Sequence, residues 1–289
     1  DWRDALHALR RYRHLQWLYA DGYHFGYIKL GTERPFVATF QPVYGLEYIH
    51  TDDDRGTISR FTSGARFEGG YSEKLRFMLD FRDHTEAGNG PYDDGHGGRS
   101  LLYEDRWASV DLKGNSSTSY DISESFIQYY GRDLSIAAGR GRHRWGPGQF
   151  GSLFLNSNNP PFDYVRFDAV LEDEKTSRAI YYTFLHGFLE SRNPADTLYI
   201  TFEGRARTIN AQKYLSAQRL EVRPRANLLF GLSQAVVYGD RGLQLGYLTP
   251  LNFLYSVQHS TDDKDNFLLG LDGTWRVVRG LKLYGEAFF

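Results

Sequence analysis

The sequence contains no cysteine, a single methionine and no excess of charge of either sign. Without cysteine the chain can form neither a disulfide framework nor a thiolate metal site, and it has no cysteine nucleophile. The 34 lysines and arginines are balanced by 36 acidic residues, so no basic field exists that would hold a nucleic-acid backbone. These absences exclude thiol chemistry and predict that nucleic acid is not a partner.

Long hydrophobic runs are also missing. The longest largely apolar stretch, residues 179–189, has about half of the roughly 20 residues that a transmembrane helix requires. The first residues, Asp1-Trp2-Arg3-Asp4, lack the apolar core of a signal peptide, so they show no targeting directly. The mean hydropathy of -0.52 does not exclude the membrane, because a barrel places only alternate side chains in lipid.

Apolar and polar residues alternate along much of the chain. Residues 74–82 place bulky apolar side chains at every second position, namely Leu75, Phe77, Leu79 and Phe81. Charged residues such as Arg76 and Asp80 stand between them, which indicates a strand with one apolar and one charged face. Residues 36–48 follow the same period, and similar segments are residues 101–112, 122–130, 133–140, 178–190, 197–207, 214–223, 227–238, 251–259, 266–278 and 280–289.

Turn-forming residues separate these segments. They are Asp54-Arg55-Gly56, Gly69-Gly70, Lys113-Gly114-Asn115, Gly131-Arg132-Asp133, Arg192-Asn193-Pro194, Gly239-Asp240-Arg241-Gly242 and Arg279-Gly280. The spacing predicts an all-β chain of about 14 antiparallel strands connected as hairpins. Pro42 lies inside a predicted strand, and because proline removes a ladder hydrogen bond we expect a bulge there.

Two architectures fit such strands: a soluble sandwich or propeller with charges outside, and a transmembrane antiparallel β-barrel with charges inside. The abundance of aromatic residues, 16% of the chain, favours the barrel because aromatic girdles mark membrane interfaces. Residues 1–20 differ, and the helical spacing of Ala5, Leu6 and Leu9 predicts a short helical or plug segment. Residues 21–289 are then the β-barrel domain, which we expect to be truncated at both ends.

The most distinctive segment is Gly139-Arg140-Gly141-Arg142-His143-Arg144-Trp145-Gly146-Pro147-Gly148, which opens a loop through Asn156-Ser157-Asn158-Asn159-Pro160. Further pieces are Gln218-Arg219-Leu220-Glu221, Gly246-Tyr247-Leu248-Thr249-Pro250-Leu251-Asn252-Phe253 and Leu283-Tyr284-Gly285-Glu286. Together they resemble the capsule assembly protein Wzi family of bacterial outer-membrane β-barrels. The resemblance implies an outer-membrane lectin that holds capsular polysaccharide at the cell surface.

The arginines of this segment suggest how such a protein would grip an acidic polysaccharide. The predicted binding residues are Arg140, Arg142, Arg144, Trp145, Asn156, Asn158 and Asn159. Guanidinium groups bind sugar carboxylates, an indole face stacks on a pyranose, and amides bind hydroxyls. We expect the three arginines to share one strand face that points into the lumen. In the alternative interpretation they pair with lumen carboxylates such as Glu47, Asp80, Glu124 or Glu221 and stiffen the wall.

The remaining candidates carry less chemistry. The acidic groups at residues 52–54, 93–94 and 262–263 lack the spacing of a calcium loop, and the histidines lack zinc spacing, so we expect no metal and no cofactor. Ser152, His143 and Asn156 could form a lipase-like trio, but no motif activates the serine. The acidic run at residues 172–174 is equally unsupported. We therefore expect no catalytic residues.

The sequence thus predicts a non-enzymatic protein of the bacterial outer membrane, a monomer whose partners are surface polysaccharide and membrane lipids. Two other functions stay open. One is an outer-membrane porin or channel, and the other is a soluble β-rich carbohydrate-active enzyme. The direction in which Leu75, Phe77, Leu79 and Phe81 point distinguishes a membrane wall from a packed soluble interior.

Overall fold

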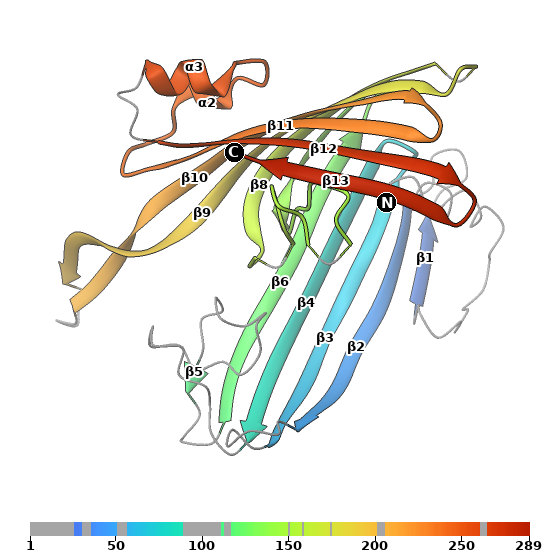
Figure 1. Ribbon diagram of the computed structural model, residues 1–289. Coiled ribbons are helices and arrows are strands. Elements are labelled where there is room, and N and C mark those ends of the chain that lie inside the picture. Colours follow the sequence, from blue (N-terminus) through green and yellow to red (C-terminus); the bar gives the residue numbers. More distant parts are fainter. Residues whose placement is uncertain are drawn as a thin grey trace.

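The computed structural model describes residues 26–30, 36–50, 57–88, 111–112, 117–149, 151–157, 159–173, 175–200, 206–260 and 265–289. These residues form one antiparallel sheet of 13 strands and two short helices (Figure 1). The strands are β1 (Gly26–Leu30), β2 (Phe36–His50), β3 (Thr57–Tyr71), β4 (Leu75–Gly88), β5 (Asp111–Leu112), β6 (Ser117–Tyr130), β7 (Leu134–Gly141), β8 (Phe162–Asp173), β9 (Arg178–Ile200), β10 (Ala206–Arg225), β11 (Leu228–Gly239), β12 (Asn266–Val278) and β13 (Leu281–Phe288). The helices are α2 (Leu245–Leu248) and α3 (Leu254–His259).

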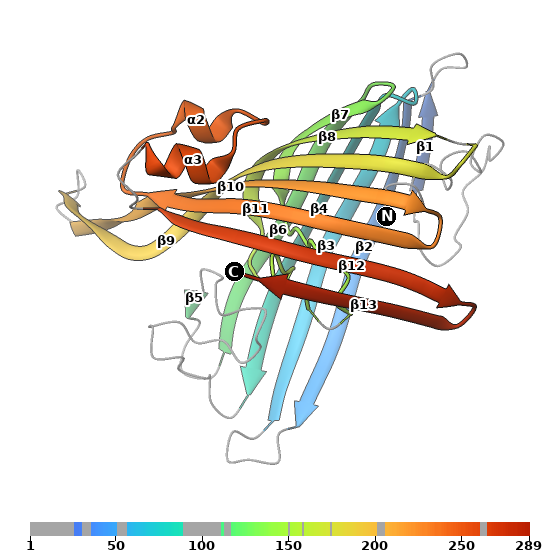
Figure 2. The ribbon, with the colours of Figure 1, turned by 45° about the horizontal axis from the view of Figure 1, so that its top comes forward.

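The strands follow one another in the sheet almost in chain order. Each pairs antiparallel with the next, from β1 to β4 and from β6 to β13, while β4 pairs directly with β6 and β5 adds to β6. The sheet curves strongly, so that β10 to β13 cross over the direction of β2 to β4 (Figures 1 and 2). Within the described residues β1 and β13 do not pair with each other, so the 13 strands form a curved sheet whose closure is not seen, against about 14 predicted for a barrel.

The two faces of this sheet are inverted relative to a soluble protein, which is the arrangement that the aromatic residues favoured of the two that fit the alternation. In β4, Leu79 and Phe81 are 45% and 43% exposed, whereas Asp80 between them is 8% exposed. The convex side, called the outer face, carries exposed apolar residues along the strands, among them Leu46, Phe61, Phe67, Ile127, Ile136, Phe230, Leu232, Leu271 and Leu283. The concave side, called the inner face, carries buried charged residues such as Arg60, Asp80, Glu86 and Arg219.

Some predicted strand limits are wrong, each for a local reason. Residues 251–259 contain helix α3 in place of a strand, and it buries Leu254 and Gln258 at helical spacing. Strand β9 continues through residues 192–194, where a turn was predicted, so the predicted strand 197–207 combines the end of β9 with the start of β10. The predicted segments also omit all of β1, β3 and β8.

Gly69-Gly70 is not the predicted turn but part of β3, where the glycines permit close strand packing. A Cβ on Gly69 would lie 2.2 Å from the Val37 carbonyl oxygen. The turn comes after them, and the positive φ it needs, 56°, is adopted by Ser72. By contrast Gly280 does form the turn predicted between β12 and β13, with φ of +89°.

Pro42 causes no bulge in β2. It pairs with Ala65 of β3 in an unbroken register, and β1 on the other side reaches only as far as Phe40. Among the described residues β2 is therefore an edge strand at Pro42, where the missing N–H costs no ladder bond. The predicted helical segment at residues 1–20 lies outside the described residues.

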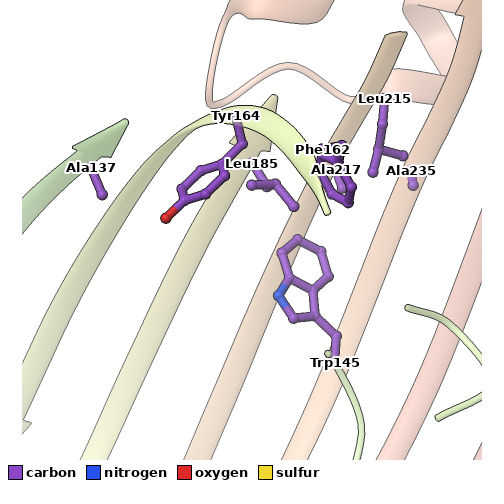
Figure 3. Packing of buried hydrophobic residues seen from close by; sticks show 8 residues of the cluster. All are labelled: Ala137, Trp145, Phe162, Tyr164, Leu185, Leu215, Ala217 and Ala235. Atoms are coloured by element: carbon purple, nitrogen blue, oxygen red, sulfur yellow. The ribbon is translucent and has the colours of Figure 1, made fainter. Parts of the chain in front are cut away.

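Apolar side chains gather in two clusters on opposite faces of the sheet. The inner cluster contains Ala137, Trp145, Phe162, Tyr164, Leu185, Leu215, Ala217 and Ala235 (Figure 3). The outer cluster contains Tyr214, Val236, Tyr238, Tyr247 and Leu254 and lies beneath α2 and α3. Within the part of the chain that the structure describes, neither helix has the length or apolar character to cross a membrane.

Candidate functional site

The loop at residues 142–161 folds back into the concave side of the sheet and is anchored there by Trp145. The indole is 6% exposed and belongs to the inner cluster, beside Leu185 and Ala217 (Figure 3). Its ring is stacked on that of Phe154, with 6.0 Å between centroids and 6° between planes. The backbone N–H of Trp145 donates to the Leu155 carbonyl oxygen at 2.9 Å, which joins the two arms of the loop.

A carboxylate of β13 fixes the tip of the same loop. The backbone N–H groups of Gly148 and Leu153 donate to the two Glu286 carboxylate oxygens at 2.7 Å and 2.6 Å. Gly146 has φ of +125°, a conformation that favours glycine. A Cβ on Gly148 would lie 2.1 Å from the Gly151 carbonyl oxygen. The Trp-Gly-Pro-Gly segment is thus a turn whose glycines are required by backbone geometry and by Glu286.

His143 is held beside two aromatic rings at the start of the loop. Its ring lies 5.4 Å from Phe162 and 4.2 Å from Tyr164, centroid to centroid, and the residue is 8% exposed. Burial, helped by the positive charge of Arg166, lowers the pKa of His143 to about 4. The imidazole is therefore neutral at pH 7 and adds no charge to the site.

Between this loop and the inner face of β8 to β13 lies a cavity of about 440 Å³, a size within the range of about 300–1,000 Å³ typical of ligand sites. Its lining residues are Arg142, His143, Arg144, Trp145, Gly146, Pro147, Arg166, Thr183, Arg219, Glu221, Leu229, Asp272, Thr274, Arg276 and Lys282. Six of them are arginine or lysine and two are acidic. The cavity wall is consequently cationic.

Part of this positive charge is neutralised by neighbouring carboxylates. Arg219, 6% exposed, donates to Asp272 at 2.6 Å and to Glu221 at 3.0 Å. Arg166 pairs in the same way with Asp168 at 2.8 Å. These groups are bound to one another and make up the rigid floor of the cavity.

Three cations at the cavity have no carboxylate partner among the described residues. Arg144 donates from Nε to the Ser152 hydroxyl at 3.1 Å. Lys282 lies with its ammonium 5.5 Å from the centre of the Tyr284 ring, and Arg276 faces it in the register of β12 and β13. Chemically the arrangement suits an anionic ligand, because guanidinium and ammonium groups bind carboxylates or phosphates.

The prediction that Arg140, Arg142 and Arg144 share one strand face is wrong, because β7 ends at Gly141. Arg140 lies on the side of β7 opposite to the inner-facing Ala137 and pairs with Asp163 at 3.0 Å. Arg142 and Arg144 belong to the loop. Only these two of the three line the cavity.

The alternative interpretation, in which the three arginines pair with lumen carboxylates, is confirmed for Arg142 alone; the other carboxylates that it named pair with other arginines. Arg142 approaches Glu124 at 3.5 Å. On the wall itself Arg60 bridges Glu47 at 3.2 Å and Glu86 at 3.0 Å. The other predicted carboxylates are also paired: Asp80 with Arg82 and Arg66, and Glu221 with Arg219.

The remaining predicted binding residues are Trp145 and the three asparagines of the loop. Stacking of a sugar on Trp145 needs an exposed indole, and its burial against Phe154 gives it an anchoring position instead. Asn156 and Asn159 are partly buried in the loop, and Asn159 donates to the Pro160 carbonyl oxygen at 3.2 Å. Asn158 lies outside the described residues.

No catalytic trio is assembled from Ser152, His143 and Asn156 in the described structure. The Ser152 hydroxyl donates to the Gly146 carbonyl oxygen at 3.4 Å and accepts from Arg144, while the His143 ring packs between aromatic rings. The acidic groups at residues 52–54, 93–94 and 262–263 lie outside the described part of the chain. Within that part no group of three or more histidine or acidic side chains could hold a metal ion.

Sequence reasoning did not find Arg166, Arg276 and Lys282 as members of the site. They lie on β8, β12 and β13, with 116 positions between Arg166 and Lys282, and only the curvature of the sheet brings them to the loop. Their inward direction could have been read from alternation with exposed neighbours such as Val165, Trp275 and Leu283.

Fold and site together define a curved antiparallel sheet with an apolar outer face, a charged inner face and a cationic cavity closed by a loop. A family model described as capsule assembly protein Wzi matches residues 39–289. The chain therefore belongs to the capsule assembly protein Wzi family, as its motifs indicated.

Among the curated proteins no significant match was found. Among solved structures the chain is similar to one titled "Copper transporter OprC", with 12% identity and a TM-score of 0.31 over 90% of this chain. The matched region covers 48% of that structure's chain, and a TM-score this low does not establish a common fold.

Proposed function

We propose that this protein is a β-barrel of the bacterial outer membrane that binds anionic capsular or other surface polysaccharide without catalysis. The membrane location is supported by the apolar outer face, where residues such as Leu46 and Phe61 are 78% and 50% exposed. Side chains of this size are costly to leave in water over a whole sheet face. Lipid is the solvent that matches them. Membership of a capsule assembly family supports the choice of ligand.

The observation that carries the binding proposal is the cationic cavity, with Arg144, Arg276 and Lys282 free of carboxylate partners among the described residues. A uronate or other acidic sugar would complete their hydrogen bonding. Arg144 supplies a planar fork for two carboxylate oxygens, and Lys282 supplies a compact charge. Trp145 and Glu286 act indirectly, since they hold the loop that carries Arg144.

Non-catalytic binding is supported by what surrounds the candidate nucleophile. Ser152 has an arginine and a backbone carbonyl as its described partners, and neither can serve as a general base. The neutral His143 packs against the rings of Phe162 and Tyr164, and its buried Nε2 has no hydrogen-bond partner among the described residues. The proposed action is therefore retention of polymer through several weak contacts.

The experiment is a charge-neutralising variant of the full chain, Arg144→Gln with Arg276→Gln and Lys282→Gln. Affinity of the purified protein for a uronate-containing polysaccharide should fall about tenfold or more for each hydrogen bond that the substitutions remove, since a hydrogen bond to a charged group is worth about 1.5–3 kcal/mol. Wild-type binding should weaken with added salt, because screening acts on charge pairs. Cells carrying the variant should shed capsule.

Arg132→Gln is the matched control, because its side chain is 94% exposed in the turn between β6 and β7. It should leave binding unchanged. Neutral dextran tests whether charge is recognised, and it should bind neither form. Equal polysaccharide binding by wild type and triple variant, at equal amounts of folded protein, would contradict the proposal.

A further inference from the structure

The α2–α3 hairpin, defined as residues 242–258, lies against the outer face of the sheet, on the side opposite to the cavity (Figures 1 and 2). Its inward residues Tyr247 and Leu254 are fully buried against Tyr214, Val236 and Tyr238 of β10 and β11. The hairpin is thus a fixed part of the wall, although it leaves the strand pattern of the rest of the chain.

The hairpin covers polar side chains that point outward from the sheet. Ser216 donates to the Tyr247 carbonyl oxygen at 2.6 Å, and Gln218 donates to the Asn252 carbonyl oxygen at 2.9 Å. Gln234 accepts from the Leu254 N–H at 3.2 Å. Without the hairpin, these outward-facing polar groups would have no hydrogen-bond partner. An unpaired polar group costs several kcal/mol of free energy next to hydrocarbon.

On the same strands the outer face is bare where the hairpin ends. In β11, Phe230 and Leu232 are 51% and 45% exposed. Val236, four residues further along the same face, is fully buried under the hairpin. In β10, Leu220 is 38% exposed on the same face. The hairpin is therefore continuous with the apolar surface that the proposed function places in lipid.

The outward side of the hairpin is itself apolar. Leu245, Leu251 and Phe253 are 80%, 84% and 60% exposed, and Tyr255 is 44% exposed. No residue from 242 to 258 is Asp, Glu, Lys or Arg, although such residues make up 24% of the chain. A hairpin facing water has no physical reason to exclude charge and expose leucine.

We propose that residues 242–258 form a membrane-interface element, whose Leu245, Leu251 and Phe253 insert into the bilayer at the boundary between headgroups and acyl chains. The inference rests on the proposed membrane location. Apolar side chains on short helices reach about 5–10 Å into this boundary, and tyrosines favour the same depth. Tyr214, Tyr238, Tyr247 and Tyr255 all gather here, so the hairpin seals the polar edge of the wall against lipid.

Single-cysteine spin labelling tests this directly, because the chain has no native cysteine. Leu251→Cys is labelled in the full chain in phosphatidylcholine–phosphatidylglycerol vesicles, and its collision rates with oxygen and with a water-soluble nickel chelate are measured. Phe230→Cys on the bare outer face gives the lipid reference, and Lys175→Cys in the exposed β8–β9 turn gives the water reference.

The expected oxygen-to-nickel ratio at position 251 is close to that at 230 and several-fold above that at 175. A nickel-accessible label at 251 would overturn the inference and leave the membrane wall intact. A label shielded from both reagents would also overturn it, since a second copy or another part of the chain would then cover the hairpin. A nickel-accessible label at position 230 would contradict the proposed membrane location itself. Phe253→Cys repeats the test independently.

Discussion

The two hydrogen bonds that Glu286 accepts make the clearest quantitative prediction. Glu286→Ala removes the only described acceptor of the Gly148 N–H, which is buried, and of the Leu153 N–H, which is at an exposed residue. Hydrogen bonds to a charged group are worth about 1.5–3 kcal/mol each. Because water can replace one of them, we expect the loop to lose about 2–4 kcal/mol of local stability.

Hydrogen exchange of the folded protein measures this loss at the two amides. Since each 1.4 kcal/mol is tenfold, protection at Gly148 should fall roughly 30- to 1,000-fold, while amides of β12 and β13 keep theirs. Glu286→Gln, which retains one carbonyl acceptor, should fall in between. Glu172→Ala is the control, because that carboxylate pairs with Arg223 away from the loop. Unchanged Gly148 protection in Glu286→Ala would refute the reasoning.

Three other substitutions test the same region. Gly146→Ala should destabilise the loop by about 1–3 kcal/mol, because alanine is strained at a φ of +125°; Gly285→Ala, with nothing within 4 Å of the new Cβ, should not. Asp272→Ala removes the main partner of the buried Arg219 and should lower the free energy of unfolding, measured with denaturant, by about 3–5 kcal/mol. An unchanged denaturation midpoint would contradict this. Burial lowers the pKa of His143 from 6.5 to about 4, so the folded loop favours the neutral imidazole. Its contribution to loop stability should be complete above pH 6.5, decrease as the pH falls below 6.5, and be lost as the pH falls through 4. The loss is on the order of 3 kcal/mol, and loop exchange in His143→Phe should show no such pH dependence.

The strand faces were predictable from sequence because side-chain direction in a strand depends only on position parity. Leu79, Asp80 and Phe81 alternate in the sequence and alternate again in exposure. The hairpin turn at Gly280 was predictable for a similar local reason, a glycine with positive φ. Such features need no knowledge of the rest of the chain.

Features that depend on contacts distant in sequence were not predictable. The apolar run at 251–259 fits a strand or a short helix equally well, and packing of Leu254 onto Val236 decides for the helix. Arg140 has the parity of the exposed Leu134 and Ile136 in β7 and points outward with them, whereas Arg142 and Arg144 lie beyond the end of β7 at Gly141, where the alternation no longer applies. Single-residue periodicity cannot reveal where a strand stops.

The pieces of sequence that indicated the family acquire a common physical purpose in the structure. Glu286, 138 positions after Gly148, holds the Trp-Gly-Pro-Gly turn, and Arg219 supplies the paired floor beneath it. One residue earlier in the same strand, Gln218 points through to the other face and bonds to the hairpin at Asn252. A single strand, β10, thus supports a cationic cavity on one face and an uncharged hairpin on the other. Because these supports share one rigid strand, a change of register in β10 would disturb both faces together, whereas the substitutions above should separate them.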